Sequence, residues 1–330
     1  MGMKINVMDG HIKVGLAQIA PVWLDKESTK EKIRSYIEDA AKENCHLVTF
    51  GEGILPGYPF WLGLTGGAEF NSDMQKEIHA HYIQNAVAIG DGELDDICDI
   101  AREKSIAVYL GTIERATDRG GHSLYASLVY IDQKGVIRSV HRKLRPTYEE
   151  RLAWSPGDGH GLQVHKLGPF TVGGLNCWEN WMPMPRMALY GMGEDLHVAV
   201  WPGSYRNTHD ITRFMAKEGR SYVISVSGLM RSSDFPPNTP YLEDILKTAP
   251  EFLTDGGSCL AGPEGEWIIE PVVDKECLLS AEIDIKNVWK ERQNFDVAGH
   301  YSRPDVFQLK VDRRRQSTIS FQDIDNPINE

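Results

Sequence analysis

Short apolar segments rich in β-branched and aromatic residues alternate with amphipathic helical patterns along most of the sequence. Residues 46–50 (HLVTF) form an apolar run typical of a buried strand, and residues 27–44 place Ile33, Ile37 and Ala40 at helical spacing. Strands that alternate with helices predict an α/β fold in which helices cover the faces of a sheet. Further strands are predicted at residues 11–21, 106–113, 123–131, 135–141, 170–177, 196–202, 221–228, 257–271 and 277–285. Further helices are predicted within residues 75–104 (two helices, broken at 90–92), near 183–192 and at 208–220.

The charge and the ends of the chain limit its partners. The net charge of −12 disfavours nucleic acids and anionic lipid surfaces as the main partner. No run of about 18 apolar residues is present that could cross a membrane. Residues 1–18 carry no signal-peptide pattern, and Asn6 stands where a myristoylation signal at Gly2 needs Ser or Thr. No repeat or low-complexity linker divides the chain, so we expect one domain at residues 1–312 and a polar, extended or disordered tail at 313–330.

The cysteines predict a reduced, cytoplasmic protein with free thiols. Their number is odd, their spacing is scattered, and no CxxC pair occurs, which argues against a disulfide framework and a zinc knuckle. The HxH pair of His79 and His81 lies on a predicted helix, where positions i and i+2 point apart. We therefore expect no metal site. The five cysteines are Cys45, Cys98, Cys177, Cys259 and Cys277.

Cys177 ends the strand pattern at 170–177 and precedes a proline-rich helix start at residue 183. A buried structural thiol is the commonest fate of a free cysteine. A cysteine at a strand-to-helix turn, however, lies near the positive end of a helix dipole, which lowers the pKa of a thiol. Cys177 is therefore a candidate nucleophile.

Charged residues follow two other predicted strands in the same way. Glu52 comes directly after the strand at 46–50, at the edge where α/β proteins bind ligands. Lys143 follows the strand at 135–141, and Glu149 and Glu150 lie in the polar loop after it. On their own these residues also fit a solvated charge run.

Three blocks of sequence carry a resemblance to a known family. They are FGEGILPGYPFW (50–61), HRKLRPTYEERLAWSPGDG (141–159) and GGLNCWENWMP (173–183), and GHYSRPDVFQL (299–309) adds to them. The chain resembles the nitrilase branch of the nitrilase superfamily of carbon–nitrogen hydrolases from about residue 12 to about residue 312. The resemblance implies a catalytic triad of Glu52, Lys143 and Cys177, with Glu150 as a second active-site glutamate. It also implies a single-domain, four-layer αββα sandwich that dimerises into larger oligomers and uses no metal or cofactor.

These residue types suit the hydrolysis of a nitrile. The weakly electrophilic nitrile carbon needs a thiolate, which Glu52 can generate from Cys177 as a general base. Lys143 and the backbone N–H of Trp178 can stabilise the negative charge that develops on nitrogen and later on oxygen. Glu150 can position Lys143 or Glu52.

The expected activity is hydrolysis of an organic nitrile to a carboxylic acid and ammonia. An amidase, or a relative that hydrates nitriles or cyanide, could use the same triad. A catalytically silent, filament-forming protein is an alternative that the intact triad disfavours. Aromatic residues near the triad could form the substrate pocket, although core or dimer packing explains such residues equally well. They are Tyr58, Trp61, Trp178 and Trp201. The orientation of Glu179, two residues after Cys177, stays open.

Overall fold

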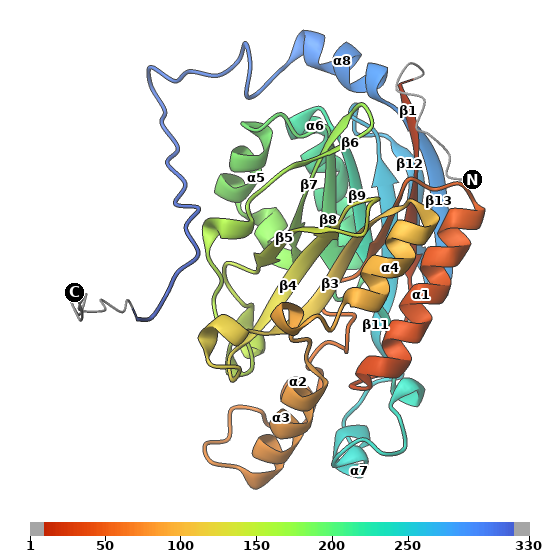
Figure 1. Ribbon diagram of the computed structural model, residues 1–330, viewed down its shortest axis with the longest axis vertical. Coiled ribbons are helices and arrows are strands. Elements are labelled where there is room, and N and C mark those ends of the chain that lie inside the picture. Colours follow the sequence, from red (N-terminus) through yellow and green to blue (C-terminus); the bar gives the residue numbers. More distant parts are fainter. Residues whose placement is uncertain (1–9, 320–330) are drawn as a thin grey trace, which may run out of the picture.

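A computed structural model describes residues 10–319 (Figure 1). The expectations about a signal peptide and Gly2, and the part of the predicted tail from residue 320 onward, lie outside the described residues. No helix among residues 10–319 is both long enough and apolar enough to span a membrane.

The first sheet has six strands. Strands β1, β2 and β3 run parallel to one another, whereas β13, β4 and β5 pair antiparallel with their neighbours. The order across the sheet is β13 (Cys277–Asp284), β1 (His11–Gln18), β2 (Leu47–Phe50), β3 (Ala107–Arg115), β4 (Leu124–Ile131) and β5 (Ile137–Arg142).

The second sheet has parallel strands β7, β8 and β9 at its centre. The order is β10 (Leu229–Arg231), β11 (Phe252–Ala261), β9 (Tyr222–Ser227), β8 (Leu196–Trp201), β7 (Phe170–Asn176) and β6 (His165–Leu167), and β12 (Trp267–Val273) also pairs with β11. Each predicted strand is present. The segment predicted at 257–271 comprises half of β11 and most of β12, because the turn between them carries the glycines that reverse the chain.

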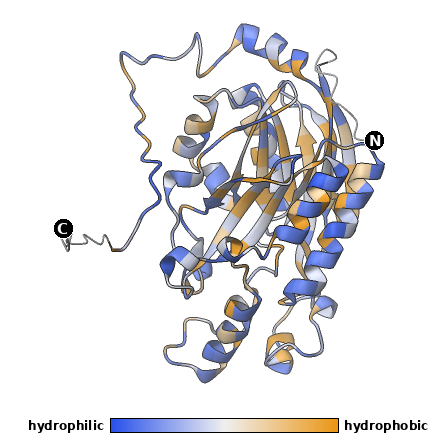
Figure 2. Cartoon of the chain, viewed as in Figure 1, coloured by the Kyte–Doolittle hydropathy of each residue, from blue (hydrophilic) through white to orange (hydrophobic). Residues whose placement is uncertain are grey.

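The two sheets pack face to face, and helices cover both outer faces (Figures 1 and 2). The amphipathic helices α1 (Lys26–Lys42) and α4 (Asp95–Lys104) bury their apolar stripes on the first sheet. Helices α5 (Pro183–Tyr190) and α6 (Tyr205–Gly219) cover the second sheet. Figure 2 shows the hydrophobic residues gathered in the sheets between hydrophilic outer helices. The arrangement confirms the αββα sandwich.

The remaining helices are short or lie at the ends of the sandwich. Figure 1 shows α2, α3 and α7 extending from the lower end and α8 lying across the upper one. They are α2 (Trp61–Leu64), α3 (Asp73–Asn85), α7 (Leu242–Leu246) and α8 (Ile285–Asn294), with 3-10 turns at Ile89–Asp91, Thr117–Arg119, Tyr148–Leu152, Gly159–Gly161, Cys177–Trp181 and Ser232–Asp234.

The chain after α8 has no further helix or strand up to residue 319, as expected for the start of the tail. It nevertheless contacts the domain beyond residue 312. Arg315 donates to the Asp158 carboxylate at 3.0 Å and to the Val140 carbonyl at 3.1 Å. The first residues of the predicted tail are therefore docked on the loop that follows Glu150.

Candidate active site

Glu52 lies just beyond the carboxyl end of β2, where the two sheets approach each other. Its backbone N–H donates to the Trp201 carbonyl at the end of β8, at 3.0 Å. A side chain on the preceding Gly51 would lie 2.7 Å from the Gly228 nitrogen, so only glycine allows this approach. The parallel strands of both sheets therefore end at the same place, and Glu52 is buried there.

Lys143 follows β5 and brings an ammonium group into the same buried space. Its Nζ lies 3.0 Å from Glu52 Oε1 and 2.7 Å from Glu150 Oε2. Its backbone is also fixed, because the Lys143 N–H donates to the Ala126 carbonyl and its own carbonyl accepts from Gly157. Lys143 is thus a buried cation between two carboxylates.

Glu150 is held by three donors. It lies in the 3-10 turn Tyr148–Leu152 and forms a capping box with Thr147, whose N–H donates to Glu150 Oε2 at 2.6 Å. The Tyr58 hydroxyl donates to Glu150 Oε1 at 2.7 Å, and Lys143 completes the set. These bonds fix the carboxylate relative to Lys143.

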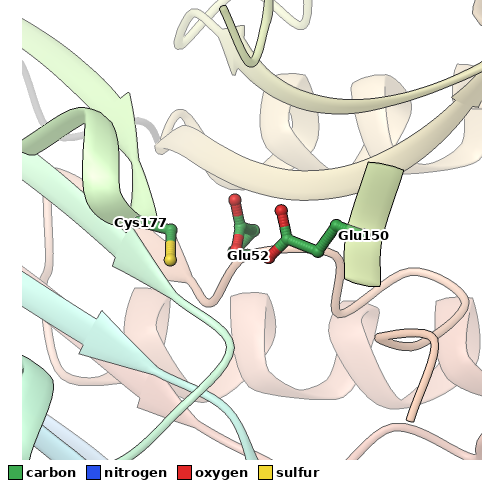
Figure 3. A group of neighbouring side chains, drawn as sticks. All are labelled: Glu52, Glu150 and Cys177. Carbon is green, nitrogen blue, oxygen red and sulfur yellow. The ribbon is translucent and has the colours of Figure 1, made fainter. Parts of the chain in front are cut away.

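Cys177 begins the 3-10 turn that follows β7, and its backbone φ is +44°. This left-handed conformation costs a non-glycine residue about 1–3 kcal/mol, and such strain clusters at functional sites. Ligand atoms of Cys177, Glu52 and Glu150 all lie within 4.8 Å of one another. Figure 3 shows Glu52 between the other two side chains.

Burial sets the protonation of the cluster. It raises the pKa of Glu52 to about 8 despite the lowering effect of Lys143, and Glu150 adds to the rise. Burial opposes the charge of Lys143, but attraction to Cys177, Glu52 and Glu150 outweighs it and holds the pKa of Lys143 above its usual value. Burial also raises the pKa of the Cys177 thiol, more than Lys143 and the Trp178 N–H lower it.

The raised pKa of the Cys177 thiol corrects one expectation. The strand-to-helix position predicts a lowered pKa for Cys177, yet desolvation is the larger effect. The Glu52 Oε2 atom is buried without a hydrogen-bond partner among the described residues, which suits a group that accepts a proton. The resting thiol of Cys177 is therefore neutral.

Glu52, Glu150 and Cys177 are also the only group of three possible metal ligands that the described residues bring together. The Lys143 ammonium already contacts both carboxylates. The residues present do not suit a divalent metal ion, because the ion would lie against the Lys143 ammonium and the two positive charges would repel each other.

A cavity of about 610 Å³ opens onto Cys177 and Glu150. Tyr58 and Trp178 are among its walls, as the sequence predicts. Polar and charged groups occur at Glu149, Arg206, Asn207 and Asp255. Its other aromatic and aliphatic walls include Phe60, Tyr148, Phe252 and Leu253.

Trp61 and Trp201 do not line this cavity. Trp61 is 1% exposed, packs against Trp23 and Tyr82, and donates to the Gln75 side chain. Trp201 is fully buried and donates to the Ser225 hydroxyl at 3.1 Å. Both are core residues: Trp201 belongs to the same buried cluster as Cys177, and its carbonyl accepts the Glu52 N–H. The sequence predicts both as pocket walls from their place in the chain, which does not reveal where a side chain points.

The sequence leaves the orientation of Glu179 open, and the structure shows that its side chain is buried. It is 1% exposed and forms a capping box with Asn176 across the Cys177 turn. The pattern of Asn followed three residues later by Glu is the signal that could have revealed it.

Known proteins are similar to this chain along most of its length. The family described as "Carbon-nitrogen hydrolase" matches residues 13–292. "Nitrilase 2" from an unknown prokaryotic organism is 36% identical over 96% of this chain and 97% of its own length. An "Aliphatic nitrilase" from Rhodococcus rhodochrous is 35% identical over 94% of this chain and 82% of its own.

Solved structures share the fold. The C. elegans NitFhit protein superposes with a TM-score of 0.67 at 17% identity, over 94% of this chain and 69% of its own. A mutant amidase from Nesterenkonia sp. AN1, with acrylamide added at its active-site cysteine, has a TM-score of 0.62 at 17% identity, over 86% of this chain and 97% of its own.

Proposed function

Because this chain belongs to the carbon–nitrogen hydrolase family and to its nitrilase branch, and is a hydrolase acting on carbon–nitrogen bonds, we propose that it converts an organic nitrile to the carboxylic acid and ammonia. The observation that carries the proposal is the buried cluster in which the Lys143 ammonium lies between Glu52 and Glu150, beside the Cys177 thiol.

In the first half-reaction, Glu52 takes the thiol proton as the sulfur of Cys177 attacks the nitrile carbon. The carbon–nitrogen triple bond becomes a double bond, and the nitrogen receives the proton to give a thioimidate. Lys143 and the Trp178 N–H stabilise the negative charge on this nitrogen in the transition state. Their fixed positions mean that little reorganisation is needed when the charge appears.

In the second half-reaction, water adds to the thioimidate carbon as Glu52 takes one of its protons and passes it to the nitrogen. The new hydroxyl then loses its proton as the carbon–nitrogen bond breaks, and the nitrogen takes up a proton and leaves as ammonia, so that a thioester remains. A second water then cleaves the thioester, so that the acid leaves and the thiol is restored. Glu150 keeps the Lys143 ammonium in place through both additions. The sum is one nitrile and two waters to one acid and one ammonia.

Ammonia release from one aromatic and one aliphatic nitrile, measured beside the matching amides, tests the proposal. A nitrilase converts the nitriles to acid faster than it converts the amides. Turnover of the amides alone would identify an amidase, and accumulation of amide from nitrile would identify a hydrating enzyme.

The raised pKa of Glu52 predicts the pH dependence of the reaction. Glu52 accepts a proton only when ionised, and its pKa lies at about 8, so kcat/KM should rise with pH through this region. Below it, loss of the ionised form should lower kcat/KM by about tenfold per pH unit. A profile between about pH 6 and pH 9, with the thermal midpoint measured at each pH, checks this. A flat profile over that range would contradict the role of Glu52 as base.

The cavity walls favour apolar nitriles with an aryl or arylalkyl group, which would be bound by burial of apolar surface and by contacts between aromatic rings.

Two tryptophans test this preference. Trp178 is 53% exposed beside the nucleophile, whereas Trp201 is fully buried. Trp178→Ala should therefore raise the relative rate on bulky nitriles at little cost in stability. Trp201→Ala should cost about 3–5 kcal/mol of stability and lower all rates alike. Thermal midpoints and rate ratios for a small and a large nitrile test the pair. Unchanged ratios in Trp178→Ala would remove Trp178 from the pocket.

A homo-oligomer and a reduced, cytoplasmic location complete the proposal. Trp181, at the end of the 3-10 turn before α5, and Phe214 of α6 border the same surface pocket and are each about half exposed, and exposed apolar side chains that gather on one surface are typical of an interface. The five cysteines are all free, which supports a reducing compartment.

A further inference from the structure

A third buried carboxylate lies beside the site, and the reaction steps above do not use it. Glu179 Oε1 accepts the Leu144 N–H at 2.6 Å, and its Oε2 accepts the Asn176 N–H at 2.9 Å. His141 Nε2 lies 3.0 Å from Oε2 and 3.2 Å from Oε1. Both carboxylate oxygens are therefore engaged.

The two backbone donors belong to the two halves of the catalytic cluster. Leu144 directly follows Lys143, at the end of β5 in the first sheet. Asn176 directly precedes Cys177, at the end of β7 in the second sheet. One side chain thus joins the segment that carries the ammonium to the segment that carries the nucleophile, across the two sheets.

Charge explains why a carboxylate occupies this position. Burial opposes ionisation of Glu179, but His141 and the two N–H groups outweigh it and hold its pKa below the usual value. Ionised Glu179 offers two oxygens to three N–H groups. An amide of the same shape has one acceptor oxygen, so its NH₂ would face a backbone N–H and leave that donor unpaired.

We propose that Glu179 is a positioning residue for nitrile hydrolysis, which fixes the Lys143 backbone relative to Cys177 so that the ammonium meets the charge that develops on the substrate nitrogen. The inference rests on the function proposed above. Displacement of a catalytic group by about 1 Å can lower a rate about a hundredfold, so a link between the two segments has a large effect on chemistry.

Glu179→Gln tests the inference, with Asp195→Asn as the matched control. The Asp195 carboxylate also accepts hydrogen bonds from a backbone N–H, that of Thr171 at 3.0 Å, and from a cation, Arg292 at 3.0 Å. It lies, however, at the amino-terminal end of β8, whereas the catalytic cluster lies at the carboxyl ends of the strands. Both variants should lose similar stability. Only Glu179→Gln should lower kcat, by at least about tenfold, with KM for the nitrile within about twofold of the wild-type value.

A second readout and a second variant keep the test decisive. Alkylation of Cys177 by iodoacetamide should slow in Glu179→Gln, because the ammonium that favours the thiolate is displaced, and should not change in Asp195→Asn. Glu179→Asp keeps the charge but is one methylene shorter and cannot reach both segments. It should lose kcat by a smaller factor, and it serves if the glutamine variant does not fold.

The outcomes separate this inference from the proposed function. If the wild type and Asp195→Asn release ammonia from nitriles and the Glu179 variants match them in kcat and alkylation rate, the positioning role is wrong. If the wild type releases none from any nitrile, the proposed function itself fails.

Discussion

Replacement of Cys177 by alanine should abolish nitrile turnover, with ammonia release falling to the level of a blank without enzyme. The Cys177 thiol lies within 4.8 Å of Glu52 and Glu150, and no other cysteine of the described residues belongs to this group, so its loss removes the thiol that forms the covalent intermediate. The thermal midpoint should stay near that of the wild type, because one small side chain is removed at the rim of a cavity.

Cys177→Ser gives the more demanding form of this test. The hydroxyl keeps the size of the thiol but is far harder to deprotonate, so turnover should remain at least about a thousandfold below the wild type. Substantial activity in either variant would remove Cys177 from the mechanism.

Changes at Glu52 and Lys143 should have the next largest effects. Glu52→Gln keeps the shape of the side chain but removes the base, and should lower kcat at least about a hundredfold. Lys143→Arg keeps the charge but places a larger planar group in a space where Nζ contacts two carboxylates, and should lower kcat comparably. Initial rates at saturating nitrile measure both.

Lys30→Arg is the matched control for the lysine. Lys30 is 9% exposed and its Nζ lies 3.1 Å from Asp96 and 3.4 Å from Glu27, but it belongs to α1 on the outer face of the first sheet. It should keep wild-type kcat. If Lys143→Arg kept it as well, the ammonium would have no role in charge stabilisation.

The positions of the proposed catalytic residues could be predicted from the sequence because they depend on where strands end. Glu52, Lys143 and Cys177 each follow a segment whose apolar composition identifies it as a strand. The carboxyl ends of parallel strands gather at one edge, so residues after them meet. The resemblance then supplied their order and Glu150.

Burial and orientation could not be predicted in the same way. The pKa of Cys177 depends on desolvation by segments distant in the sequence, which outweighs the local dipole. Trp178 follows a strand pattern and Trp201 ends one, but only packing decides that Trp178 lines the cavity and Trp201 fills the core. The role proposed for Glu179 depends on the hydrogen bond from the Leu144 N–H to its carboxylate, which joins segments that are distant in the sequence.

The most direct test of the account is mass spectrometry of the enzyme quenched with acid during steady-state turnover of a nitrile. The account predicts a mass increase equal to the bound thioimidate or acyl group, confined to the peptide that carries Cys177. The increase should be absent from Cys177→Ala. Two results would contradict covalent catalysis at this site. One is an adduct on another cysteine, which means Cys45, Cys98, Cys259 or Cys277. The other is an unmodified Cys177 in an enzyme that is releasing ammonia.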